Sequence, residues 1–497
     1  MNRFCKKLVQ TVSVCLLVVA LLATSVGAVI PYSSYTYDSY GNAVETSDLY
    51  EPEVVFSGYD LGVSMLSQPT DMYVAQDGLL YLLDAGNSRV LVLDQNFAVK
   101  RVVDRILLED QQQQLNKASG IFVDRSGSIY IADTGNNRIL CMDGFGKVFR
   151  IIEKPESEYF SEEVEFLPNK LVMDRANNLY VQCTGIYQGL VVFDTAYEFQ
   201  GFFGSDMVET TSEALRDFFW KQFMTEEQKE AMANYVPPEI RNFDITSNDF
   251  IYTITTAQFI PLDTTKTEMD SIRCLNPKGG DTLTNKMSEN AYKAMELDAR
   301  ALNFVDICYD EKGFINAVDS LRGKIYQFDQ NMNLVTAFGA LGDYSGTFTM
   351  PVSIEVSGDR ILVLDRTKCN LTVFRLTETG QNVHYALELY HAGKYTEAIE
   401  PWKKVIEENT NFELAYIGVG NALYNQQDYA GAMGYFKLGR DGDKYSEAFK
   451  EYRVQLLRGN IGWIIIVLVL IFLCWFLFKN QKRLFQRKAN FSKERKG

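Results

Sequence analysis

Two stretches of the chain repeat each other closely. Residues 78–94 and 127–143 align at a constant offset of 49 residues (78 to 127). Each stretch has two β-rich runs separated by the sequence Asp-x-Gly-Asn-x-Arg. A repeat of this length marks one supersecondary unit that cannot bury its apolar side chains alone. The chain is therefore expected to fold as an array of such units.

Weaker copies of the same plan follow along the chain. In each copy two β-rich runs flank a turn, and Gly or Asn supplies the positive φ that tight hairpins require. Several short strands every ~45–50 residues are typical of β-propeller blades. With the two strong copies this predicts a mainly β fold, a six-bladed propeller spanning residues 53–379. The weaker copies occupy residues 177–194, 248–275, 313–329 and 358–374.

The two strong copies carry a recognisable motif. At these residues the chain resembles NHL-repeat propellers, whereas the four weaker copies keep the apolar pattern and lose Asn and Arg. We expect a mainly structural role, in which a buried Asp accepts backbone N–H groups of the following turn and Arg ties adjacent blades; ligand binding is the alternative. The motif residues are Asp84, Asn87, Arg89, Asp133, Asn136 and Arg138.

Two segments interrupt the array. Residues 205–238 contain two sequences typical of capping boxes, Thr210-x-x-Glu213 and Thr225-x-x-Gln228, which predict helices. Residues 276–301 include a second predicted helix. Long insertions in a regular scaffold often carry function, and the alternative is that they cover an apolar patch.

Beyond the propeller the apolar period changes to that of helices. Residues 381–458 contain a pattern that recurs after 34 residues (Tyr395 and Tyr429), which resembles tetratricopeptide repeats. A third helix, Tyr445–Leu457, is expected to cap the pair. The resemblance implies a groove for an extended peptide, and a stiff spacer is the alternative. The candidate groove residues are Leu387, Tyr390, Ile417, Asn421 and Tyr424.

Both ends of the chain indicate export and anchoring. Residues 1–28 are typical of a signal peptide cut after Ala28, with an uncleaved anchor as the alternative, and 29–52 are expected to be a linker. Residues 461–478 are uncharged and predict one transmembrane helix. The basic segment 479–497 is then expected to be a cytoplasmic tail, with the bulk outside a bacterial cell membrane.

The net charge narrows the choice of partners. The chain carries −15, and because both ends are basic, the part between them is more acidic still. Such a surface repels nucleic acid and anionic lipid. We expect a protein or peptide partner, which the residues do not identify; another membrane protein and a glycan are the alternatives. Five scattered cysteines between the two ends show no zinc or disulfide spacing and are expected to be buried as small apolar residues; one disulfide is left open.

Some propellers of the kind that this chain resembles are enzymes. The resemblance implies lactonases and amidating lyases, which use a metal, but both histidines of this chain, His384 and His391, lie in the helical region. We therefore expect no metal, no cofactor and no enzyme, but a membrane-anchored binding or scaffold protein. The alternatives are a Ca²⁺-dependent hydrolase or lyase at the central channel, and a sensor. Three or more carboxylates from different blades meeting at the channel mouth would favour the enzyme.

Overall fold

The computed structural model divides the chain into two compact units, residues 1–381 and 382–497. Each unit is described by itself. The described residues are 30–37, 42–157, 160, 165–204, 239–255, 272–283 and 302–494.

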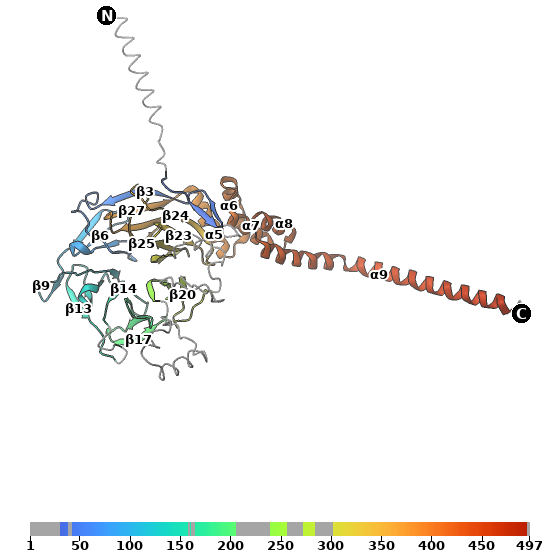
Figure 1. The fold of residues 1–497 in the computed structure, drawn as a ribbon, viewed down its shortest axis with the longest axis horizontal. Helices are drawn as coiled ribbons and strands as arrows, with labels where there is room; N and C mark the ends of the chain where they lie inside the picture. Colours follow the sequence, from blue (N-terminus) through green and yellow to red (C-terminus); the bar gives the residue numbers. More distant parts are fainter. Residues whose placement is uncertain are drawn as a thin grey trace, which may run out of the picture. The chain divides into compact units, whose positions relative to one another are not determined.

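Six antiparallel sheets, the blades, make up the first unit (Figure 1). Within each blade the strands named below lie side by side in chain order. The first three blades contain β4 (Asp71–Val74), β5 (Leu80–Asp84), β6 (Arg89–Leu93) and β7 (Val99–Val103); β10 (Gly120–Val123), β11 (Ile129–Asp133), β12 (Arg138–Met142) and β13 (Val148–Ile152); and β14 (Pro168–Met173), β15 (Leu179–Cys183), β16 (Leu190–Phe193) and β17 (Phe199–Phe203). The last three contain β18 (Ile240–Ile245), β19 (Ile251–Thr255) and β20 (Ile272–Leu275); β21 (Phe304–Tyr309), β22 (Ile315–Asp319), β23 (Lys324–Phe328) and β24 (Leu334–Phe338); and β25 (Pro351–Ser357), β26 (Arg360–Asp365) and β27 (Asn370–Leu376). Two 3-10 turns join the second and third strands of the first two blades, η1 (Ala85–Asn87) and η2 (Thr134–Asn136). A short hairpin of β8 (Leu107–Leu108) and β9 (Gln111–Gln112) lies between blades one and two.

The first strands of the six sheets form a closed ring. Each of β4, β10, β14, β18, β21 and β25 contacts the next, and β25 contacts β4. The predicted six-bladed propeller is therefore confirmed. Its apolar cores lie between successive blades, which is why strands such as β5 and β22 are buried along their whole length rather than on alternate residues.

The N-terminal segment completes two blades. β3 (Tyr50–Ser57) pairs antiparallel with β27 and becomes the fourth strand of the last blade. β1 (Tyr35–Tyr37) and β2 (Ala43–Glu45) extend the fifth blade at the edge of β24. The segment 29–52, expected to be a linker, thus holds β1, β2 and the start of β3, because two exposed sheet edges need a partner for their backbone groups.

The five cysteines of the propeller are free thiols. Cys141, Cys183, Cys274 and Cys308 are buried and Cys369 is half-buried. They serve as small apolar residues, as expected.

The second unit is helical. α5 (Glu378–His391) begins at the end of the first unit, and α6 (Tyr395–Glu408), α7 (Glu413–Asn425) and α8 (Tyr429–Leu438) follow. α6 packs on α7 and α7 on α8. Glycines permit this approach: a Cβ on Gly420 would lie 2.6 Å from the Phe436 ring.

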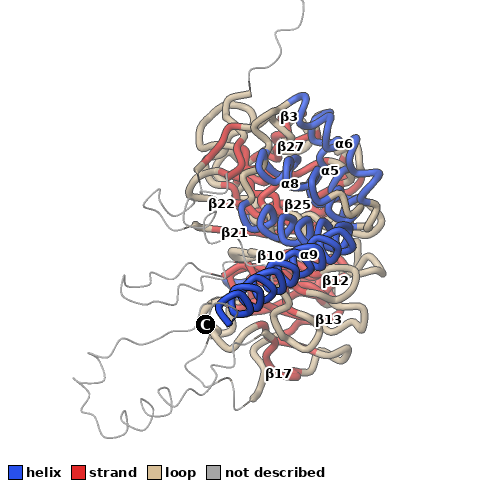
Figure 2. Tube along the Cα trace, turned by 90° about the vertical axis from the view of Figure 1, so that its right-hand side faces the viewer, coloured by secondary structure: helices blue, strands red, loops and turns tan. Residues whose placement is uncertain are grey.

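The last helix is longer than predicted. α9 (Gly442–Glu494) is one continuous helix of 53 residues, drawn without interruption in Figure 2. The capping helix, the apolar span and most of the basic tail, expected as separate parts, are merged, because only Gly459 and Gly462 interrupt the good helix formers and each costs about 1 kcal/mol. By length and composition this helix can cross a membrane; its most apolar window has a mean hydropathy of 3.0, and none of that window is buried.

Two predicted features fall outside the described residues. These are the signal peptide and the insertion at 205–238. Of the other insertion only 276–283 is described, and it forms a turn in which Gly279 N–H donates to Asn276 O.

Candidate functional site at the channel mouth

The inner strands place one residue per blade in a common layer. In the antiparallel ladder between the first and second strands of its blade, each of these residues is paired with the last but one residue of the second strand. Asp71 is paired in this way with Leu83, and Lys170 with Gln182. Polar side chains therefore meet around the channel axis at positions that are far apart in the sequence. The six residues are Asp71, Gly120, Lys170, Asn242, Asp306 and Ser353.

Lys170 connects blades across this layer. Its Nζ lies 2.9 Å from Asp71 Oδ1, 3.1 Å from Asp71 Oδ2 and 3.7 Å from Asp306 Oδ1. Asp71 also accepts from Ile121 N–H at 2.9 Å and from the Ser353 hydroxyl at 2.9 Å. Four blades thus share one buried carboxylate, and removing a partner would leave a buried charge unpaired.

Asp306, on blade five, connects the remaining two blades. Its carboxylate accepts from Asn242 Nδ2 at 2.7 Å and from Ile354 N–H at 2.8 Å. Burial raises the pKa of Asp306 to about 6, Asp71 adds to the rise and Lys170 opposes it. Burial disfavours the charged form of Lys170, but Asp306 and Asp71 outweigh burial, so the pKa of Lys170 is raised.

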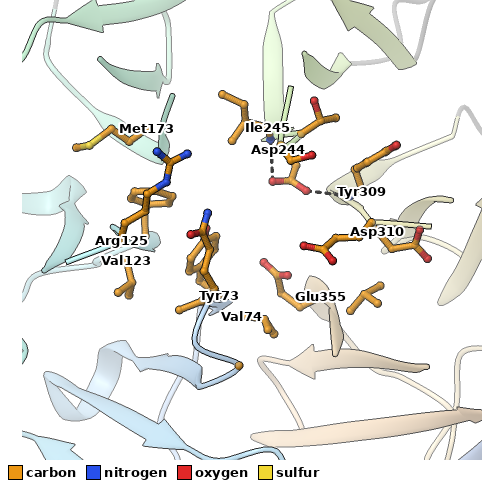
Figure 3. Close-up of a pocket in the computed structure, with 18 of the residues that line it drawn as sticks. Tyr73, Val74, Val123, Arg125, Met173, Asp244, Ile245, Tyr309, Asp310 and Glu355 are labelled. Carbon is orange, nitrogen blue, oxygen red and sulfur yellow. Dashed lines mark hydrogen bonds between the residues drawn. The ribbon is translucent and has the colours of Figure 1, made fainter. Parts of the chain in front are cut away.

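The next layer opens into a cavity. Its six residues lie two positions further along the same strands, and they are Tyr73, Phe122, Val172, Asp244, Cys308 and Glu355. The cavity has a volume of about 430 Å³ and is lined by all six blades. Figure 3 shows the carboxyl groups of Asp244 and Glu355 pointing into the same space. This arrangement defines the channel mouth.

The two carboxyl groups at the mouth differ in their surroundings. Asp244 accepts from Tyr309 N–H and Ile245 N–H, both at 2.8 Å. The Glu355 carboxyl group makes no hydrogen bond or ion pair with any described residue. Burial is the main reason that the pKa of both groups is raised, and that of Glu355 lies well above its usual range because Asp244 adds repulsion. Burial likewise raises the pKa of Asp310, which lines the same cavity, to about 6.

Acids outnumber bases inside the channel. Asp71, Asp244, Asp306 and Glu355 come from four different blades, and within the two layers only Lys170 opposes them. These four residues do not form the cluster at the channel mouth that would favour an enzyme, because Asp71 and Asp306 lie in the deeper layer against Lys170 and, of the four, only Asp244 and Glu355 line the cavity. The described residues contain no group of three or more His, Cys, Asp or Glu placed to hold a metal ion. Their geometry therefore gives no support to a Ca²⁺-dependent hydrolase or lyase.

The six motif residues lie away from this mouth, where the second strand of a blade turns into the third. Asp84 accepts from Ser67 N–H at 2.7 Å, Asn87 Nδ2 at 2.8 Å and Arg89 Nε at 2.7 Å. Arg89 also donates to Ser64, in the connection that enters the blade. Their polar atoms are thus used in structural hydrogen bonds. The N–H group bound by this Asp comes from the preceding connection, not the following turn; Asp133, Asn136 and Arg138 repeat the set in blade two.

The five candidate groove residues lie in the helical unit with different exposure. Leu387 is 2 % exposed and so has no surface for a ligand. Ile417 and Asn421 are half-buried on α7. Tyr390 stacks edge-on against Tyr395. Tyr424 does the same against its neighbour on α8 and donates a hydrogen bond to α9.

Sequence reasoning missed the channel residues. A signal existed, since Asp71 and Lys170 each lie 13 residues before the end of a second strand (71 and 84, 170 and 183). Aligning the six copies at that position would have collected five residues of the first layer, with Ser353 one position out of step (353 and 365). The pattern was passed over because the residue types differ from blade to blade.

The fold and the mouth define a six-bladed propeller with a polar, acidic channel entrance. The NHL repeat family model matches residues 115–142. A search of curated proteins found no match. Among solved structures, a streptogramin B lyase is 10 % identical, with 67 % of this chain and 100 % of that chain covered at a TM-score of 0.41.

Two further matches are structures of virginiamycin B lyase from Staphylococcus aureus. The selenomethionine form is 11 % identical, covers 63 % of this chain and 81 % of its own, and has a TM-score of 0.37. A catalytically inactive histidine-to-alanine variant with quinupristin is 11 % identical, covers 70 % and 97 %, and has a TM-score of 0.38. These matches contradict the prediction that this chain is not an enzyme, since the matched structures are those of lyases; they assign no activity to this chain.

Proposed function

We propose that the channel mouth binds a small ligand carrying a basic nitrogen, and that α9 tethers the protein to a membrane with the propeller outside the cell. The observation that carries the proposal is the pair Asp244 and Glu355. Both carboxyl groups face the cavity, both have raised pKa values, and Glu355 has no partner among the described residues.

The electrostatic reason is direct. An ionised Glu355 faces Asp244 and the deeper carboxylates, while Lys170 is already held by Asp71. A ligand cation placed between Asp244 and Glu355 would supply the missing charge and favour loss of the Glu355 proton. The half-buried ring of Tyr73 offers a second attraction for such a cation.

Binding is testable with benzylammonium, which carries one ammonium and one ring. Titration calorimetry on the full chain in detergent is expected to show binding of benzylammonium and at least about tenfold weaker binding of neutral benzyl alcohol. Glu355→Gln and Asp244→Asn should each weaken benzylammonium binding by about tenfold. Glu311→Gln, an exposed acid at the rim, is the matched control. Equal binding of the alcohol, or unaffected variants, would refute the proposal.

A second candidate is acid–base catalysis at the same mouth. It is favoured by the raised pKa of Glu355, because burial favours the protonated form of this carboxyl in a pocket open to ligands. Glu355 would donate a proton and Asp244 would accept one; the propeller sequence contains no histidine for either task. The test is turnover of a panel of lactones and esters, where activity must fall in Glu355→Gln and persist in Glu311→Gln.

For the helical pairs we keep the peptide-groove proposal without Leu387. The remaining candidates are Tyr390, Ile417, Asn421 and Tyr424. A pull-down with the protein and with a Tyr390→Ala, Tyr424→Ala variant tests it, since unchanged partners would leave the stiff-spacer alternative.

A further inference from the structure

The rim of the mouth is built from equivalent turn positions. The turn after each inner strand places one residue at the cavity edge, and in blades two, three and five these are Arg125, Arg175 and Glu311. In blade two, Asp124 accepts from Ser126 N–H at 2.8 Å and Ser128 N–H at 2.9 Å, which fixes the turn that carries Arg125. The charge of the rim therefore differs from one side to the other.

Arg125 is the cation left over at this rim. Arg175 donates from Nε to Asp249 Oδ2 at 2.9 Å, and Lys312 pairs with Asp359. Arg125 makes no hydrogen bond or ion pair with any described residue. Among the cavity-lining residues that the structure describes, it is the one cation with a free guanidinium.

The free guanidinium and the acidic pair lie on different sides of one cavity. Figure 3 shows Arg125 on the side formed by blade two, and Asp310 and Glu355 on the opposite side. Tyr73 lies between them, and Met173 adds an apolar surface beside Arg125. A ligand with only an amine leaves the guanidinium unused, and one with only an acid group meets the repulsion of Asp244 and Glu355.

We propose that the ligand of the mouth is zwitterionic, an amino acid or a short peptide with both ends free. Its ammonium lies between Asp244 and Glu355, its carboxylate binds Arg125, and its apolar side chain packs on Tyr73 and Met173. A planar guanidinium binds a carboxylate through two parallel hydrogen bonds, which makes this contact selective for the acid group. The inference rests on the proposed binding of a basic nitrogen and adds the second charge.

Three probes of matched size separate the two charges. Titration calorimetry on the full chain in detergent compares L-phenylalanine, phenethylamine and 3-phenylpropionate. L-Phenylalanine is expected to bind about tenfold or more tightly than phenethylamine, and 3-phenylpropionate more weakly than both. Arg125→Gln should reduce the affinity for L-phenylalanine to that for phenethylamine and leave phenethylamine unchanged.

The control is Arg175→Gln, the equivalent turn residue that is already paired. It should change the affinity for L-phenylalanine by less than about threefold. Unchanged thermal unfolding of both variants shows that the fold is intact. Equal affinities for L-phenylalanine and phenethylamine, unaffected by Arg125→Gln, would overturn the zwitterion while the basic-nitrogen site stands. Absence of binding by both amines would overturn the site itself.

Discussion

Lys170 on the third blade and Asp71 on the first form an ion pair across the channel, with Nζ 2.9 Å from Oδ1. Both side chains are nearly inaccessible, at 8 % and 4 % exposure. Asp306 faces the same ammonium at 3.7 Å, so one lysine holds carboxylates from blades one and five. Two interactions thus hold the ring together: the ion pairs of Lys170 in the channel, and the pairing of β3 with β27 at the outer edge of the last blade.

Replacing Lys170 by Met is expected to destabilise the propeller strongly. Two buried carboxylates would lose their cation, a loss that costs about 3–5 kcal/mol in buried pairs. Thermal unfolding of the full chain measures it. Lys100→Met is the control, because Lys100 pairs with Asp94 on the surface and should cost below about 1 kcal/mol. Equal shifts in both variants would show that the pair does not hold the ring.

Glu355→Gln is expected to stabilise the protein as pH rises. The pKa of Glu355 is raised on folding, so the folded state binds its proton more tightly than the unfolded chain does. The contribution of Glu355 to the free energy of unfolding is therefore fully present below its unfolded-state pKa of 4.5. It is lost as the pH rises toward the folded-state pKa. Gln avoids that loss. Urea unfolding should find the variant equal to the natural chain at pH 4 and more stable at pH 8; a pH-independent difference would contradict the raised pKa.

The motif pair Asp84 and Arg89 is expected to show strong coupling. The two side chains meet at 2.7 Å, and Arg89 continues to the connection that enters the blade. A double-mutant cycle with Ala should give a coupling of about 1.5–3 kcal/mol by thermal unfolding. The half-exposed pair Arg175 and Asp249 is the comparison, with an expected coupling below about 1 kcal/mol. Similar couplings would rule out a special role for the motif.

The α7–α8 pair should respond in opposite directions to two glycine substitutions. Gly420→Ala places a Cβ 2.6 Å from the Phe436 ring and is expected to lower the unfolding midpoint of the helical unit. Gly434→Ala meets no atom within 4 Å, so the gain in helix propensity of about 0.5–1 kcal/mol should raise it. Circular dichroism at 222 nm follows both. A destabilised Gly434→Ala would show that α8 packs differently.

Removal of the apolar part of α9 is expected to release the protein from membranes. A chain ending at Arg458 lacks the window with a mean hydropathy of 3.0, whereas the full chain should resist alkaline carbonate extraction. Fractionation and immunoblotting measure this. A truncated chain that still sediments with the membranes would show that another segment anchors it.

The propeller was predictable because its repeat is local. Asp84 and Arg89 recur as Asp133 and Arg138 with the same short-range hydrogen bonds, so sequence similarity and structure coincide. Ring closure was not predictable in the same way. β3 carries no motif, and its place beside β27 depends on a free sheet edge more than 300 residues away in the chain (56 and 371). The unbroken α9 was not predicted, because its three parts differ in composition: a polar segment up to Leu457, the apolar span 461–478 and the basic tail.

The acidic mouth was harder to predict than the fold. Asp244 and Glu355 come from strands that carry the weaker repeats, and no nearby residue marks them as ligands. What makes them a candidate site is the absence of a described partner for Glu355 and the burial that raises its pKa, both of which depend on the assembled ring. The sequence analysis instead expected Leu387 in a peptide groove, where folding buries it.

Proton release on binding tests the acidic mouth most directly. Calorimetric titration with L-phenylalanine at pH 7, in two buffers of different ionisation enthalpy, reports the protons exchanged. A cation between Asp244 and Glu355 must lower the pKa of Glu355, so the protein should release a fraction of a proton per ligand bound, and Glu355→Gln should release almost none. Binding with no proton exchange in the natural chain, or the same release from Glu355→Gln, would contradict the account.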